Sequence, residues 1–169
     1  PGDPRRVASV LTFVVTSVND SVALWQHVPE AMLDATEIHD RILRAQLNAH
    51  GGREARRGAN EGFVVVFDDS AAALRFCFAT QLELLKSEWP AELLATTQAG
   101  VVRGDDKRDL LRGLRVSMGI HRGAAIARKD LATDRTEYFG PAASRAAELA
   151  DLGFGGLILA EPSLEADVS

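Results

Sequence analysis

Cysteine is nearly missing from this sequence, which has 169 residues and a single thiol at Cys77. An intramolecular disulfide is therefore excluded. A lone thiol is typical of a reducing compartment, so we expect a cytoplasmic domain with Cys77 as a small buried side chain. No run is long and apolar enough to cross a bilayer, and the start does not resemble a signal peptide. Because the chain begins at Pro1 rather than Met, we expect it to be part of a longer protein.

The sequence also lacks a basic excess, with 19 Lys and Arg against 24 Asp and Glu and a net charge of −5. This balance argues against nucleic-acid binding, and an anionic ligand would need local positive groups. The four histidines and one cysteine show no metal-site spacing, and there is no phosphate loop or nucleophile elbow. Apolar residues make up 46% of the chain, which predicts one folded domain over residues 1–169.

The apolar pattern predicts five main strands. The first is nearly all apolar and is expected to be central in a sheet and buried on both faces. The segment at 53–57 is a weak candidate because it is mostly charged, whereas the stretch after Gly62 is rich in valine. The expected strands cover residues 7–16, 53–57, 62–67, 114–121 and 156–160.

Four helices are predicted between these strands. A short one includes Trp25, and a long amphipathic one starts at Pro29 and stops at Gly51. A third follows the cap residue Asp69, and an alanine-rich helix covers 141–152. Residues 91–112 are expected to form a polar surface insertion, and residues around 129–134 a hairpin-like arm.

The resulting order is β-α-α-β-β-α-β, followed by an arm, a helix and a strand. This indicates an α/β (α+β) fold of the ferredoxin-like class, with an antiparallel-dominated sheet and helices packed on one face.

Seven strings, in this order and spacing, resemble the catalytic domain of class III adenylyl/guanylyl cyclases. The stretch from Phe76 to Pro90 points to the fungal adenylyl cyclase type, and the trypanosomatid receptor type is also similar. The strings are ALW (23–25), GGRE (51–54), GFVVVF (62–67), GLRVSMGIHRG (113–123), YFGP (138–141), RAA (145–147) and GGLIL (155–159).

The resemblance implies a known chemistry. In the family, two aspartates hold two Mg²⁺ ions that activate the ribose 3′-hydroxyl and hold the triphosphate. A lysine and an aspartate read the adenine, an asparagine orients the ribose, and an arginine stabilises charge on the transferred phosphate. The sites form at a dimer interface.

The metal positions carry over poorly. The first metal aspartate falls on Ser17, whose neutral hydroxyl is a weak ligand for Mg²⁺. The second falls on Glu61 when counted back from Phe63, or on Asn60 when counted forward from Gly51, because this hairpin is one residue longer than usual.

The nucleotide positions are altered as well. The adenine lysine falls on Arg56 or Arg57, and the adenine aspartate on Glu137. The ribose asparagine falls on Ser144, and the transition-state arginine falls on Glu148, which reverses the charge.

These losses predict a catalytically degenerate cyclase homologue that acts by pairing with an identical chain or with another cyclase domain. Two alternatives stay open: an active adenylyl cyclase module that works only in a heterodimer, and a nucleotide sensor that binds a purine nucleotide without turnover. We expect no cofactor, and Mg²⁺ or Mn²⁺ with ATP if any activity remains.

Overall fold

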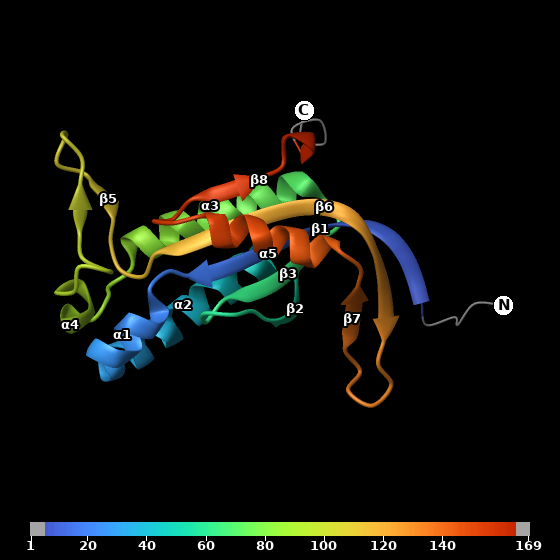
Figure 1. Ribbon diagram of the computed structural model, residues 1–169, viewed down its shortest axis with the longest axis horizontal. Helices are drawn as coiled ribbons and strands as arrows, with labels where there is room; N and C mark the ends of the chain where they lie inside the picture. The colour runs from blue at the N-terminus through green and yellow to red at the C-terminus, as the bar shows by residue number, and fades with distance from the viewer. Residues whose placement is uncertain (1–5, 165–169) are drawn as a thin grey trace.

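The computed structural model describes residues 6–164, in which helices lie on both sides of one six-stranded sheet (Figure 1). The strands of this sheet follow the order β2-β3-β1-β6-β7, and β8 pairs with β6. The helices are α1 (Ser21–His27), α2 (Pro29–Ala49), α3 (Ser70–Lys86), α4 (Ala91–Leu94) and α5 (Ala142–Leu152), with a 3-10 turn at Pro162–Leu164. The strands are β1 (Arg6–Val18), β2 (Arg53–Arg57), β3 (Phe63–Phe67), β4 (Val102–Arg103), β5 (Asp109–Leu111), β6 (Val116–Lys129), β7 (Thr136–Phe139) and β8 (Ile158–Ala160).

The predicted central strand is confirmed. β1 lies between β3 and β6, antiparallel to both, so that Val14 faces Val65 on one side and Ile120 on the other. Residues 11–18 are all buried or nearly so, as the apolar run predicted. The following helices begin where expected: Pro29 is the first residue of α2, and the Asp69 carboxylate accepts hydrogen bonds from the first turn of α3.

The expectation that all helices pack on one face is wrong. Alternate side chains of β1 enter two separate cores. Val14 belongs to the core covered by α2 and α3, whereas Phe13 and Val15 belong to a second core on the opposite face. That second core is closed by α5, through the buried alanines at 142, 146 and 150. These alanine side chains are small enough for the helix to lie close against the sheet.

The contact between α5 and the sheet is unusually close at Gly119 of β6. A Cβ atom added there would lie 2.0 Å from the carbonyl oxygen of Ala146 and 2.4 Å from the nitrogen of Ala150. Gly119 therefore lets the helix backbone rest directly on the strand, and it fixes the position of the exposed face of α5.

The segment 91–112 is only partly the surface insertion that was expected. Its β4–β5 hairpin projects from the body of the domain (Figure 1), but Leu93 and Ala99 are fully buried in the α2–α3 core. Buried Arg115 ties the segment down, since its guanidinium donates to the carbonyls of Gly113 and Gly100. The apolar residues between the polar ones thus anchor the segment.

The arm is confirmed and is longer than predicted. β6 continues past residue 121 to Lys129 because the exposed first residues of β1 still pair with it, as far as Arg6 opposite Arg128. β7 then returns along β6, with Tyr138 opposite Ala127. In the part of the chain covered by the structure, no helix has both the length and the apolar character needed to span a membrane.

Candidate functional site

The turn between β2 and β3 is held against the end of β1. Asn60 and Glu61 both have left-handed backbone, with φ of 48° and 56°. The Asn60 carbonyl accepts from the nitrogen of Val18 (3.0 Å), and the nitrogen of Phe63 donates to Thr16 Oγ1 (2.9 Å). Gly62 permits this closeness, because a Cβ atom there would lie 1.8 Å from the Thr16 carbonyl oxygen. The turn therefore has one fixed position relative to Ser17.

Ser17 lies at the end of β1, nearly buried, and Asn60 is its partner. Asn60 Nδ2 donates to Ser17 Oγ at 3.2 Å. Both residues line a cavity of about 210 Å³, together with Asp20 and Asp151. The two positions that the turn brings together are thus a neutral hydroxyl and a neutral amide.

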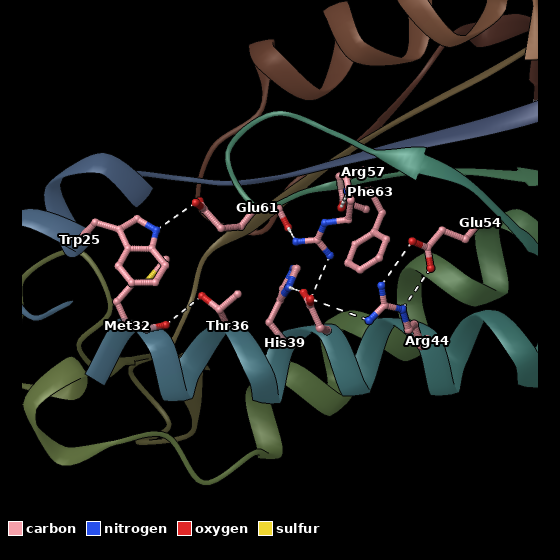
Figure 2. Close-up of polar contacts among 11 residues, drawn as sticks. Trp25, Met32, Thr36, His39, Arg44, Glu54, Arg57, Glu61 and Phe63 are labelled. Atoms are coloured by element: carbon pink, nitrogen blue, oxygen red, sulfur yellow. Dashed lines mark hydrogen bonds and ion pairs between the residues drawn. The ribbon is translucent and has the colours of Figure 1, made fainter. Parts of the chain in front are cut away.

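Glu61 points toward Trp25 of α1 (Figure 2). Its Oε1 accepts a hydrogen bond from Trp25 Nε1 at 2.9 Å, whereas Oε2 is buried without a hydrogen-bond partner among residues 6–164. The left-handed conformations of the turn set this direction. The hairpin therefore contains a carboxylate, that of Glu61, but this carboxylate is hydrogen-bonded to the indole of Trp25.

The extra residue of the hairpin lies in β2 and not in the turn. The pairing of β2 with β3 shifts by one residue between Glu54 and Arg56, which leaves Ala55 as a β-bulge. After the bulge Arg57 faces Phe63. The residues from Arg56 onward therefore keep a regular register to Phe63, and Glu61 stands two residues before it.

Arg57 is held against α2 rather than left free to read a base (Figure 2). Its guanidinium lies 4.1 Å from the centre of the Phe63 ring, donates to Asp40 Oδ2 at 2.9 Å and also donates to the Glu61 carbonyl. Burial alone would raise the pKa of Asp40, but hydrogen bonds from His39 and Arg57 outweigh it and hold that pKa below its usual value. Arg57 and Asp40 thus form a structural pair.

The remaining predicted residues are exposed, and Glu137 lies on a different element from Ser144 and Glu148. Glu137 of β7 pairs with Arg128 of β6, within the arm. Ser144 and Glu148 lie one turn apart on the exposed face of α5, and Glu148 is 69% exposed with only a loose contact to Arg145 at 3.7 Å. The structure brings Ser17 and Asn60 together, and the acids that line the same cavity are Asp20 and Asp151 rather than Glu61, Glu137 or Glu148.

These residues do not meet the requirements of a site for two metal ions. Mg²⁺ prefers several oxygen ligands with charged carboxylates among them. Within residues 6–164 there is no group of three or more His, Cys, Asp or Glu side chains that could hold a metal ion.

Two partners of the site residues were missed from the sequence. Trp25 lies in the predicted short helix and Asp40 in the predicted long helix, and the sequence marks neither as a site residue. Neither has a local signal that would predict its partner, because Glu61 and Arg57 are reached only after the chain has folded back over α2.

Comparisons with known proteins agree on the relationship, although no protein-family model matches the chain. The chain is 36% identical over 148 residues to an adenylate cyclase of Schizosaccharomyces pombe, covering 88% of this chain and 9% of that protein. It is 37% identical over 150 residues to an adenylate cyclase of Mycosarcoma maydis, covering 89% and 6%. The chain thus spans less than a tenth of the length of these curated relatives.

Solved structures share the fold. An adenylate cyclase from Trypanosoma brucei, determined in its monomeric state, superposes with a TM-score of 0.83 at 24% identity, over 95% of this chain and 76% of that one. The adenylyl cyclase CyaB from P. aeruginosa gives 0.74 at 18% identity, over 96% and 82%. The strand order, the sequence strings and these relatives lead to one conclusion: the chain is a class III nucleotidyl cyclase-homology domain, related to the fungal adenylate cyclases.

Proposed function

We propose that this domain is a catalytically degenerate cyclase homologue that works by pairing with a second cyclase-type domain, as a regulator or scaffold. One observation carries the proposal. Where the family's first metal carboxylate would stand, Ser17 is hydrogen-bonded to the amide of Asn60, and the Glu61 carboxylate accepts a hydrogen bond from Trp25. A pair of neutral groups does not compensate the positive charge of Mg²⁺.

Two further positions support the loss of turnover. Glu148 presents a negative charge on α5 where the resemblance places a cation for the transferred phosphate. A pair of unit charges about 4 Å apart is worth roughly 4 kcal/mol at an effective dielectric of about 20. Solvent reduces this energy at an exposed carboxylate, but the interaction between Glu148 and a phosphate is still repulsive. Ser144, one turn earlier, lacks the amide that would orient a ribose.

Pairing is supported by apolar surface on the arm. Three large side chains are between 44% and 54% exposed there: Val10, Ile126 and Phe139. Around them lies a cavity of about 510 Å³, lined mainly by β1, β6 and the segment after β7. Exposed apolar patches of this kind mark interaction surfaces more often than scattered single residues do. In the proposed pair this surface is covered.

Turnover tests the first half of the proposal. The purified domain should form no detectable cyclic AMP or cyclic GMP from ATP or GTP with Mg²⁺ or Mn²⁺, measured by mass spectrometry. The variant Ser17→Asp/Ser144→Asn/Glu148→Arg restores the family's groups and should gain activity if these positions alone are limiting. Turnover by the unchanged domain within a few hundred-fold of an ordinary cyclase would contradict the proposal. Binding of an ATP analogue without turnover would favour a nucleotide sensor.

Sedimentation tests the second half. The domain alone, and mixed with an active fungal-type cyclase domain, should form a dimer at micromolar concentration. Val10→Lys/Phe139→Lys should weaken it, whereas Val22→Lys, at a 63% exposed valine on α1, should not. A monomer in every mixture would leave pairing without support.

A further inference from the structure

A cavity of about 220 Å³ lies between the end of α3, strand β5 of the projecting hairpin and the residues that lead into β6. Its walls are mostly leucine, and the charged residues among the described ones that line it are two arginines, Arg112 and Arg115. The leucines are Leu82, Leu84, Leu85, Leu110, Leu111 and Leu114. This leucine cavity shares no lining residue with the cavity at Ser17 or with the one at the arm.

The lining of the leucine cavity includes both exposed and buried side chains. Leu82 of α3 and Leu110 of β5 are 53% and 58% exposed, whereas Leu84 and Leu114 are almost fully buried. The cavity is therefore accessible from solvent and has a dry, apolar interior. Since a cavity of about 150 Å³ takes the six carbons of benzene, this one has room for roughly nine carbon atoms.

Arg115 brings a buried positive charge to this cavity. The residue is 8% exposed, and its guanidinium donates to the carbonyls of Gly113 and Gly100. Within residues 6–164 no carboxylate lies within ion-pair distance of it. Burial lowers the pKa of Arg115, as it does for any cation removed from water. Because buried charges in proteins are normally paired, an anion in the cavity would compensate this one.

Arg112 adds a second, half-buried cation. Its Nη1 donates to the Ser87 carbonyl at 2.6 Å, and in the same described range it also has no carboxylate partner. A guanidinium has five N–H donors, so these arginines have donors left for a ligand. An apolar chain that ends in a carboxylate is complementary to such a site. Its chain is removed from water by the leucines, and its carboxylate accepts charge-assisted hydrogen bonds.

We propose that the leucine cavity binds a medium-chain carboxylic acid, with the chain among the leucines and the carboxylate at Arg112 and Arg115. Burial of the chain supplies most of the affinity, and the arginines select an acid over an alcohol of the same length. The inference goes beyond turnover and pairing, because the cavity is formed by one chain and lies apart from the arm.

Calorimetric titration of the wild-type domain with octanoate, 1-octanol and butanoate tests the proposal. Octanoate should bind at least fivefold more tightly than 1-octanol, because hydrogen bonds to charged groups are the stronger ones. It should bind at least tenfold more tightly than butanoate, because each buried methylene group contributes about fourfold. The ratio of the octanoate and octanol affinities isolates the contribution of the carboxylate.

Two variants and two controls locate that contribution. Arg112→Gln and Arg115→Gln should each reduce the ratio at least threefold. The controls Arg75→Gln on α3 and Arg103→Gln on the hairpin remove the same charge outside the cavity, at 63% and 64% exposure, and should change the ratio less than twofold. Circular dichroism checks the folding of each variant. If Arg115→Gln does not fold, Arg112→Gln decides the outcome, since it removes only the hydrogen bond to Ser87.

Three results would overturn the proposal: no binding of octanoate at 5 mM, binding of 1-octanol as tight as that of octanoate, or an equal loss in the cavity variants and the controls. The second result would mean that the cavity accepts any apolar group, such as a side chain of a partner protein. Failure of these titrations leaves the turnover and sedimentation tests unaffected, because the cavity shares no residue with the sites that those tests address.

Discussion

Replacing Gly119 by alanine should destabilise the domain strongly, because the helix that carries Ser144 and Glu148 rests on this glycine. The added Cβ would lie 2.0 Å from the Ala146 carbonyl oxygen and 2.4 Å from the Ala150 nitrogen. Both atoms are backbone, so no side-chain rotation relieves the overlap, and α5 must move away by an ångström or more. Overpacking of this kind costs about 1–3 kcal/mol, and we expect the upper end.

Urea unfolding followed by circular dichroism measures this cost. A loss of about 3 kcal/mol is a large fraction of the 5–15 kcal/mol typical of a domain, and it should lower the midpoint without changing the slope. Gly104→Ala is the control, since its Cβ would meet only the Asp106 and Leu110 side chains at 3.2 Å or more. It should stay within about 0.5 kcal/mol of the wild type. A Gly119→Ala change that is as mild as the control would refute the direct packing of α5 on β6.

Three further predictions concern groups beside the site. Because the folded pKa of Asp40 lies below its unfolded value of 3.8, its stabilisation is present above that value and is lost as the pH falls through the folded pKa. The stability of Asp40→Asn, which also loses about 1 kcal/mol of pairing with Arg57, should therefore fall less than that of the wild type between pH 5 and pH 2 in urea titrations. Trp25→Phe removes the donor to Glu61 and should cost about 1–3 kcal/mol by the same assay; a neutral effect would mean that water replaces the indole. Burial raises the pKa of the Cys77 thiol, so a thiol reagent at pH 8 should react only at the rate of unfolding, and immediate labelling of the folded domain would contradict its position.

Much of the fold was accessible from the sequence because its elements have strong local signals. The β-branched run before Ser17 predicted the central strand, and the caps Pro29 and Asp69 predicted where helices begin. The alanine helix was also predicted, but not its side of the sheet. An alanine stripe is compatible with either face, and only the glycine opposite it, Gly119, decides which face admits so close an approach.

The candidate site was predictable in its positions but not in its contacts. The resemblance directed attention to Ser17 and Glu61, and the structure places both at one end of the sheet. The direction of Glu61 depends on two left-handed residues in succession, which no pattern in the sequence signalled. The ambiguity between Asn60 and Glu61 arose because an extra residue can sit in a turn or in a strand, and only the pairing with β3 places it at Ala55.

The bulge at Ala55 has a further consequence for how the domain behaves in solution. β2 is an outer strand of the described sheet, and outer strands can template edge-to-edge aggregation. A bulge twists the strand and interrupts the regular spacing of its free backbone groups, and the flanking arginines add mutual repulsion between neighbouring molecules. A second chain therefore finds no straight, neutral edge on which to add a strand. Strand addition at this edge is disfavoured. Association of two domains through side-chain surfaces such as the arm therefore does not compete with edge-to-edge aggregation.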